Sequence, residues 1–442
     1  MSNISQTTIR LFVFFFGLVF SASTIAVEEV AKPSPARFLE AVVMKGKELP
    51  ALLNKPVADY SLMAVHKGKL SAIPYQFDDK NIRGLTYVEG GILAVDGKAG
   101  VLEEKDELVF MYKDLGIKAD ESARTLSTGT VVSELEITEK GSSRYAYLVQ
   151  GNPERSDKSY THYDMKTGLL ETEYYSLQLD PENLLLWSDW NVKGFEGTPS
   201  APNVLDTMKV RVKAKLGFIG ATLHGGLIPV KMLAAKNGPV RSIIEADASI
   251  SILGINLAKA GVSTTFTAQT IEYPVFAALP KAAGVLSTLK ISVTLDYVDF
   301  EGSRYRTALG PKEPMITGTK EAAKLRDKYT MDLDHPWVTI STGKDWDMFF
   351  FFFHEENFRP SLNAVYKDGK AGDKADKPER FKGSNSEMGV SLDDVPVGLE
   401  TSLHFNLYFG PDLWQGNNPE AAAADILNPA KVIVNSTLIG NM

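Results

Sequence analysis

The side chains that could do chemistry in this chain are carboxylates and histidines next to expected strand ends. Enzymes that act on polysaccharides need only carboxylate, histidine or tyrosine groups brought together across a concave sheet, so their residues can be far apart in sequence. The catalytic candidates are two histidine–carboxylate pairs and one single histidine, namely His162 with Asp164, His354 with Glu355, and His335. These residue types suit acid–base chemistry. The sequence leaves open whether the protein is an enzyme.

Tryptophans near carboxylates are candidates for ligand binding. Trp187 and Trp190 lie three residues apart on either side of Asp189, and Trp337 follows closely after one of the histidine candidates. Aromatic faces suit the apolar faces of pyranose rings, so the first pair predicts a sugar-stacking platform that includes the carboxylate. The alternative is that these rings fill a core or a domain interface.

Two further binding candidates, Asp78 and Asp79, end the segment I-P-Y-Q-F-D-D at residues 73–79. A second segment, K-D-E-L-V-F-M at residues 105–111, also joins a short apolar run to carboxylates at one end. This pattern predicts two half-buried strands that meet at an acidic rim. The alternative is that these carboxylates are solvated loop residues.

The histidine spacing does not predict a metal site. No two of the six histidines have a metal-ligand spacing on one helix, and His354-Glu355-Glu356 lacks the second histidine of a zinc-protease motif. No nucleophile elbow, phosphate loop or dinucleotide fingerprint occurs in a strand-to-helix setting. We therefore expect no metal, no cofactor and no nucleotide chemistry.

The composition excludes several classes of partner. The 442 residues include no cysteine, which rules out disulfides, thiolate chemistry and zinc–thiolate sites. The net charge of -8 argues against nucleic acid or an anionic membrane surface, because both reward clustered lysine and arginine. After the first segment no apolar run is long enough to cross a bilayer, so we expect no membrane span in the mature protein. A glycan is the favoured partner, and the oligomeric state stays open.

Residues 1–26 have the organisation of a secretory signal peptide. Arg10 precedes an apolar run at residues 11–20, and small residues follow. The run is short for a membrane span, and Thr24-Ile25-Ala26 is a suitable cleavage site. We therefore expect a periplasmic or extracellular protein whose mature chain begins at Val27. A retained membrane anchor is the alternative.

The elements that must position these residues are mostly strands. Short runs separated by Gly, Pro and Asp turns predict a small antiparallel β-sandwich at residues 27–150. Residues 151–160 have the composition of a linker, and longer strands predict a larger β-sandwich at residues 161–442. The expected fold is therefore all-β, with two β-sandwich domains of which the second is larger.

Several segments of the second domain give sharper predictions. Residues 208–216 alternate between apolar and polar side chains, which predicts a strand with one buried and one cationic face. The five phenylalanines at residues 349–353 predict a strand covered on both faces. Thr319 can cap a helix over residues 320–328, and a second short helix is expected at residues 419–426.

The pairing of I-P-Y-Q-F-D-D with the downstream D-E-L-V-F resembles the N-terminal β-module of a secreted bacterial family of unassigned activity that is often associated with polysaccharide breakdown. Relatives of that kind usually carry an Asp- and Gly-rich loop before D-E-L-V-F. This chain has V-L-E-E-K at residues 101–105 instead, so calcium binding at the acidic rim stays open. The turn K-N-G-P-V-R at residues 236–241 resembles a hairpin in the large sandwich of mutarotase-like carbohydrate-active proteins.

The function that these features favour is exported carbohydrate recognition, with polysaccharide processing as an extension of it. The family resemblance implies the same role. The alternative is a non-catalytic protein of the periplasm or cell surface that takes part in assembly or interaction. In that case the same tryptophans and carboxylates would hold a glycan or a partner without turnover.

Overall fold

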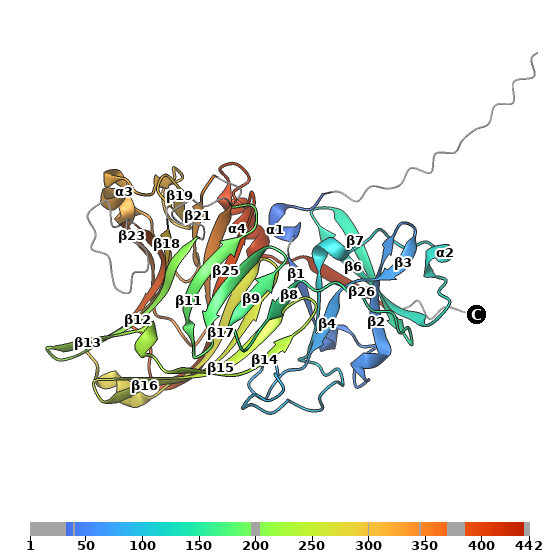
Figure 1. The fold of residues 1–442 in the computed structure, drawn as a ribbon, viewed down its shortest axis with the longest axis horizontal. Helices are drawn as coiled ribbons and strands as arrows, with labels where there is room; N and C mark the ends of the chain where they lie inside the picture. Colours follow the sequence, from blue (N-terminus) through green and yellow to red (C-terminus); the bar gives the residue numbers. More distant parts are fainter. Residues whose placement is uncertain are drawn as a thin grey trace, which may run out of the picture.

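The computed structural model describes residues 32–38, 40–195, 204–298, 300–343, 346–368 and 385–436. Strand accounts for 52% and helix for 11%, so the expected all-β class is confirmed. The chain forms two β-sandwich domains, the smaller on the right and the larger on the left of Figure 1. The expected signal peptide lies outside the described residues. No helix within the described ranges is long and apolar enough to cross a membrane.

The first domain packs a three-stranded sheet against a five-stranded sheet. The three-stranded sheet has the order β1 (Ala41–Lys45), β5 (Glu107–Met111), β4 (Tyr75–Asp78). The five-stranded sheet has the order β26 (Lys431–Asn435), β6 (Thr130–Glu139), β7 (Ser142–Gln150), β2 (Tyr60–His66), β3 (Lys69–Ala72). Side chains from both sheets, such as Leu62, Leu108 and Leu135, meet in a buried core.

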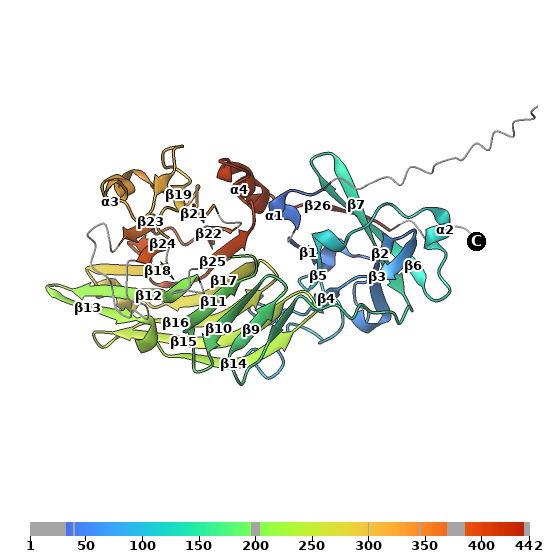
Figure 2. The ribbon, with the colours of Figure 1, turned by 45° about the horizontal axis from the view of Figure 1, so that its top comes forward.

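The last strand of the described residues belongs to this first domain. β26 pairs with β6 after helix α4 (Pro419–Leu427) has carried the chain back from the second domain (Figure 2). The sequence-based boundaries had placed all of residues 161–442 in the second domain. This boundary is corrected for β26, which pairs with β6 in the first domain. Pairing between strands about 300 residues apart leaves no local pattern in the sequence.

The second domain packs two sheets against one large sheet. The large sheet has the order β14 (Val230–Asn237), β15 (Ser242–Ile252), β16 (Ile255–Phe266), β17 (Thr270–Leu279), β25 (Leu399–Gly410), β22 (Asp347–His354), β21 (Trp337–Ser341), β19 (Arg304–Thr307), β20 (Met315–Ile316). One facing sheet has the order β13 (Ile219–His224), β12 (Leu205–Leu216), β18 (Thr288–Val298), β24 (Asn385–Asp393), β23 (Ser361–Asp368). The other facing sheet has the order β11 (Asn183–Val192), β10 (Tyr175–Asp180), β9 (Leu169–Thr172), β8 (Thr161–Tyr163). All three contribute side chains to one core.

Two of the sharper sequence predictions concern strands; that for β22 is confirmed, and that for β12 is confirmed in part. β12 alternates as expected at its outer end, where Val212 and Ala214 are buried and the lysines at residues 213 and 215 are exposed. The expected cationic face is not solvated along the whole strand, because Lys209 is buried and its ammonium group contacts the Asp296 carboxylate. In β22 the phenylalanines at residues 349–352 are buried whichever face of the sheet they point to. A strand that is apolar on both faces is therefore covered on both faces here.

Helices are few and short. Thr319 caps α3 (Lys320–Leu325), because its hydroxyl accepts a hydrogen bond from the Ala322 N–H at 3.1 Å. The expected helix at residues 419–426 is α4, which runs one residue further. The other two α-helices of the described residues are α1 (Pro35–Phe38), which packs beside α4, and α2 (Glu121–Arg124) in the first domain.

Two parts of the protein cover the outer face of the large sheet. α4 and Trp414 pack on one part of it, against Phe349 and Phe351. The first domain packs on another part, where Val109 of β5 and Val240, which lies just before β15, belong to one buried apolar cluster. The candidate site lies on this outer face, between α4 and the first domain.

Candidate functional site

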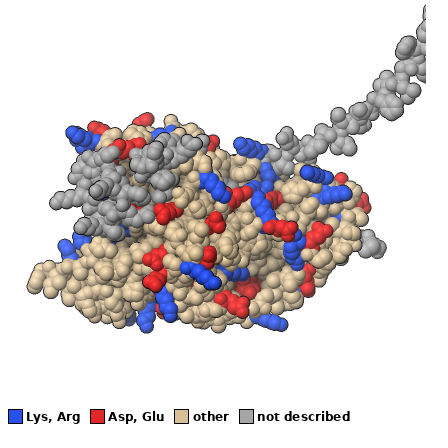
Figure 3. Space-filling view, in the orientation of Figure 1, with Lys and Arg blue, Asp and Glu red and all other residues tan. Residues whose placement is uncertain are grey.

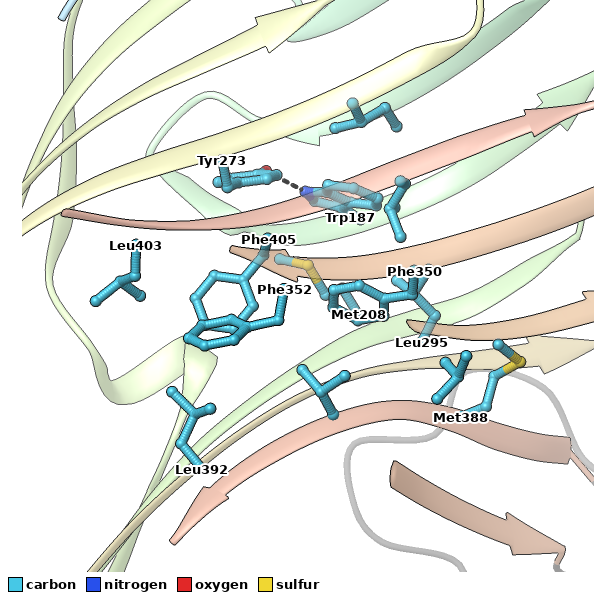
Figure 4. Close-up of a cluster of buried hydrophobic side chains, with 14 of the residues drawn as sticks. Trp187, Met208, Tyr273, Leu295, Phe350, Phe352, Met388, Leu392, Leu403 and Phe405 are labelled. Atoms are coloured by element: carbon cyan, nitrogen blue, oxygen red, sulfur yellow. Dashed lines mark hydrogen bonds between the residues drawn. The ribbon is translucent and has the colours of Figure 1, made fainter. Parts of the chain in front are cut away.

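The expected sugar-stacking platform is part of the core. Trp187 and Trp190 have exposed fractions of 2% and 0%. The Trp187 Nε1 donates a hydrogen bond to the Tyr273 hydroxyl at 2.8 Å, and the two rings stack (Figure 4). The Trp190 ring packs edge-on against Phe409, with 5.0 Å between centroids. A stacked sugar needs an exposed ring face, so the ligand-binding prediction for these two rings is corrected.

A β-bulge explains why both tryptophans face inward. In a regular strand, residues three apart point to opposite faces. The register of β11 shifts between the pairs Gln178–Ser188 and Ser176–Asn191, so β11 carries one extra residue there. Asp189 lies in this bulge with a φ of 47°, and its side chain is exposed at the surface. The Asp189 carboxylate therefore lies apart from the two buried rings, and its ligand-binding role stays a prediction.

Trp337 also lacks an exposed ring face. It lies on the outer face of the large sheet, where its ring packs against Phe349 with 5.7 Å between centroids. Together with Trp414 it forms part of the apolar cluster beneath α4. The prediction that Trp337 stacks on a ligand is corrected for the same physical reason.

The candidate catalytic histidines lie at strand ends or on a short strand, but not at one place. His162 is exposed on β8. His335 and His354 lie at the same end of the β21–β22 ladder, where the Phe352 N–H donates to the Pro336 carbonyl at 3.0 Å. The structure thus brings two of the three histidines to one end of the large sheet and leaves the third in a different sheet.

The contacts of these candidates are local. Asp164 accepts a backbone hydrogen bond within its own turn, which lowers the pKa of its carboxyl. The His335 Nδ1 lies 3.0 Å from the Asp332 carboxylate, and the His354 Nδ1 lies 2.7 Å from the carbonyl of Glu355. These are contacts typical of turns at strand ends. The catalytic roles of these residues stay predictions.

The expected acidic rim is a buried ionic network between the domains, formed by Asp78, Lys80 and Glu107 of the first domain with Lys236 and Arg241 of the second. Asp78 is completely buried. Arg241 donates to Asp78 at 2.7 Å and to Glu107 at 2.6 Å. Lys236 contacts Asp78 at 2.6 Å, and Lys80 contacts Glu107 at 2.7 Å. We call these five residues the interdomain ion network.

The strand pairing requires this network. Asp78 and Glu107 lie directly opposite each other on the β4–β5 ladder, where like charges repel. Burial alone would raise the pKa of Asp78, but Arg241 and Lys236 bring this pKa down to about 2. Both carboxylate oxygens of Asp78 already accept hydrogen bonds from these cations and from Gln76. The ligand-binding prediction for Asp78 is corrected, because its oxygens are occupied.

Asp79 and Asp106 hold the neighbouring loop. The Asp79 carboxylate accepts from the Gly100 N–H at 3.1 Å. Asp106 accepts from the backbone N–H groups of Lys80 and Glu103 at 2.8 and 2.7 Å. These bonds use oxygens that a calcium ion would need. Within the part of the chain that the structure describes, no group of three or more metal-ligating side chains occurs. A ligand-binding role for Asp79 stays a prediction.

A cleft of about 700 Å³ opens between the two domains. Its walls come from α1 and β1 on one side and from β17 and β25 on the other, and the segment between α4 and β26 closes it further. The polar side chains in these walls include Arg37, Glu40, Gln269, Glu272 and Tyr408. A cleft of this volume is in the range of small-molecule sites in proteins.

Two carboxyl groups with raised pKa values line this cleft from different domains. Burial raises the pKa of Glu272 on β17, and Arg241 of the interdomain ion network opposes that shift. Burial also raises the pKa of Glu40, although the Arg37 guanidinium 2.6 Å away works in the other direction. Burial, together with the charges of both glutamates, raises the pKa of Tyr408. Tyr408 is therefore close enough to both Glu272 and Glu40 for their charges to affect its pKa.

The sequence interpretation missed these three residues. Glu40 stands alone before a short strand, and Tyr408 lies in a long apolar strand. Glu272 offers the one usable signal, because it is the single charged residue of β17, whose sequence is T-I-E-Y-P-V-F-A-A-L. A lone charge in an otherwise apolar strand is costly to bury, so it points to a polar site at that position.

No protein family matches the chain, and no curated protein matches its sequence. Solved structures overlap with it in part. An alpha-mannosidase from Enterococcus faecalis V583 overlaps with 90% of this chain at 9% identity and a TM-score of 0.48, and 44% of the mannosidase chain is covered. A protein in the glycosyl hydrolase family 38 from Enterococcus faecalis overlaps with 90% of this chain at 9% identity and a TM-score of 0.43, with 45% of that protein covered.

A third structure, heparinase III, overlaps with 43% of this chain at 8% identity and a TM-score of 0.26, with 23% of its own chain covered. The chain therefore spans less than half the length of each of these three proteins. Overlaps with TM-scores this low do not establish a shared function.

Proposed function

We propose that the protein binds a carbohydrate in the interdomain cleft and processes it by acid–base chemistry with Glu272 and Glu40. The observation that carries this proposal is the pair of carboxyl groups with raised pKa values in one cleft of about 700 Å³. Perturbed carboxyl groups in a cleft are typical of functional sites. The family resemblance of the first domain favours the same substrate class.

The two carboxyl groups suit different steps. A carboxyl group with a raised pKa keeps its proton to a higher pH, and it can then donate that proton to a leaving glycosidic oxygen. Glu272 suits this role because no cation lies at hydrogen-bonding distance from it among the described contacts. The charges that act most on its pKa belong to the interdomain ion network. Glu40 suits the role of base, because Arg37 at 2.6 Å favours its ionised form.

The walls of the cleft also offer apolar surface. Val43 of β1 and Ile433 of β26 are both exposed and both line it. Apolar side chains of this kind can pack against the apolar face of a sugar ring, while Gln269 and the carboxyl groups hydrogen-bond to its hydroxyls. This division of apolar and polar wall supports a carbohydrate over a purely apolar ligand.

The alternative is a non-catalytic assembly or interaction protein of the periplasm or cell surface. One observation favours it. Glu40 accepts a hydrogen bond from the Ala430 N–H at 3.2 Å in addition to its pair with Arg37, so it fastens the returning segment before β26. A carboxylate used in this way can be purely structural.

We further propose that the protein is exported and that its mature chain begins at Val27. This proposal rests on the apolar run and cleavage site within residues 1–26. N-terminal sequencing of the secreted or periplasmic product tests it. A product that begins at Met1 in the cytosol contradicts it.

A glycan array followed by product analysis tests the function. We expect a bound glycan to be turned over by the native chain, and Glu272→Gln to lose turnover while keeping binding. Glu245→Gln is a matched control, because burial raises the pKa of Glu245 as well but Glu245 lies outside the cleft. Binding without turnover supports the non-catalytic alternative. Absence of binding to any glycan refutes the carbohydrate proposal.

A further inference from the structure

A second cavity lies inside the large sandwich, away from the interdomain cleft. It has a volume of about 150 Å³ and lies between β12 and β18 on one side and β14 to β17 with β25 on the other. Alanines such as Ala248 and Ala260 line the large-sheet side. Tyr273 also lines the cavity, but its hydroxyl accepts from Trp187 and donates to the Leu184 carbonyl. The lining therefore offers apolar surface to a ligand.

Small side chains account for this cavity. Facing sheets of a sandwich lie about 10 Å apart, and large side chains on both inner faces are needed to fill the gap. Towards the free end of the sandwich, alanines of β15 to β17 face Val210 and Val293 instead. Nearer the first domain the same gap is filled by large side chains such as Trp187 and Phe350 (Figure 4).

The apolar lining continues along one hairpin to an exposed tip. Val212, Ala214 and Leu216 occupy alternate positions of β12 and so share one face. Leu216 pairs with Ile219 across the turn to β13, and both are exposed. Phe218 in that turn is 98% exposed. β13 forms the far left end of the molecule in Figure 1, and Figure 3 shows few charged groups at that end.

An apolar tip that leads towards an apolar cavity has the form expected for binding a lipid chain. Exposed apolar side chains that gather at one place mark an interaction site rather than chance exposure. Aromatic and aliphatic side chains at such a tip can enter the interface of a lipid layer.

We propose that the cavity between the sheets binds the end of an aliphatic chain taken from a lipid layer, and that Phe218 and the neighbouring apolar tip contact that layer. The cavity matches in size an engineered apolar cavity of about 150 Å³ that binds benzene, so it accommodates roughly six carbon atoms. This inference is independent of the interdomain cleft, since the two cavities share no lining residue.

Isothermal titration of the full chain with hexanoate, octanoate and decanoate tests the cavity. Burial of one methylene multiplies the binding constant by about four. The cavity accommodates roughly six carbon atoms and hexanoate has five beyond its carboxyl group, so octanoate should bind about fourfold more tightly than hexanoate, and decanoate little more tightly than octanoate. Ala260→Leu fills part of the space and should weaken octanoate binding by about tenfold or more. Equal affinity for all three acids overturns the proposal, as does unchanged octanoate binding by a folded Ala260→Leu. Should that variant not fold, the chain-length series on the native chain decides.

Flotation with phosphatidylcholine vesicles tests the tip. Phe218→Ser should lower the vesicle-bound fraction severalfold while octanoate affinity stays within about twofold, because an exposed side chain adds little to folding. Ile82→Ser is the matched control, since Ile82 is 62% exposed in a loop of the first domain, and it should leave the bound fraction unchanged. If the native chain does not bind vesicles, or if Phe218→Ser binds them equally well, the tip does not contact lipid and the proposal fails.

Discussion

Arg241→Ala should destabilise the protein strongly, because this one guanidinium is shared by two buried carboxylates. It donates to Asp78 at 2.7 Å and to Glu107 at 2.6 Å. Removing one partner of a buried ion pair costs about 3–5 kcal/mol, since an uncompensated charge stays behind. Lys236 still contacts Asp78 at 2.6 Å and Lys80 still contacts Glu107 at 2.7 Å. We therefore expect the lower end of that range, about 3 kcal/mol.

Urea unfolding followed by tryptophan fluorescence and by circular dichroism measures this loss. All 5 tryptophans lie in the second domain, so fluorescence reports on that domain while circular dichroism reports on both. Lys105→Ala is the control, because Lys105 forms an ion pair with Asp96 at 2.7 Å that is exposed, and its removal should leave the midpoint nearly unchanged. An Arg241→Ala variant within about 1 kcal/mol of the native chain would refute the role of the network.

The same network should appear in the acid dependence of stability. The pKa of Asp78 is about 2 in the folded chain, against about 3.9 in an unfolded one, so its ionisation stabilises the fold by roughly 2–3 kcal/mol at neutral pH. Because the folded-state pKa is the lower one, this stabilisation is complete above about pH 5 and is lost as the pH falls towards 2. Asp78→Asn should be less stable at pH 7 and less sensitive to acid. If the free energy of unfolding of Asp78→Asn falls between pH 5 and 2 as steeply as that of the native chain, the low pKa of Asp78 is contradicted.

Three further predictions follow from the fold and the cleft. Trp190→Ala should destabilise the protein by about 3–5 kcal/mol in thermal unfolding, because it leaves a cavity in the core; a folded variant of native stability would contradict its burial. Turnover of a glycan should fall as the pH rises through the raised pKa of Glu272, since the protonated form is the acid, and Glu272→Gln should abolish that limb of the pH profile. A chain that ends at residue 428 should lose hydrogen-exchange protection along β6, because β26 is its neighbour on one side; native protection there would show that β26 adds nothing.

Local patterns in the sequence were sufficient for the all-β class and for individual elements. The alternation at residues 208–216 and the cap at Thr319 reappear as β12 and α3. Such features depend on side chains within one or two turns or on the period of a single strand, so a short window of sequence contains the physical cause.

The candidate site could not be predicted in this way. Trp187 and Trp190 are both buried because a bulge in β11 against β10 changes the alternation between them, and a bulge depends on the partner strand. Asp78 is occupied by Arg241, which lies in the other domain. Glu40 and Glu272 line one cleft because the domains dock and β26 returns to the first sheet. These placements depend on packing between segments far apart in the chain, and only the tertiary structure brings such segments together.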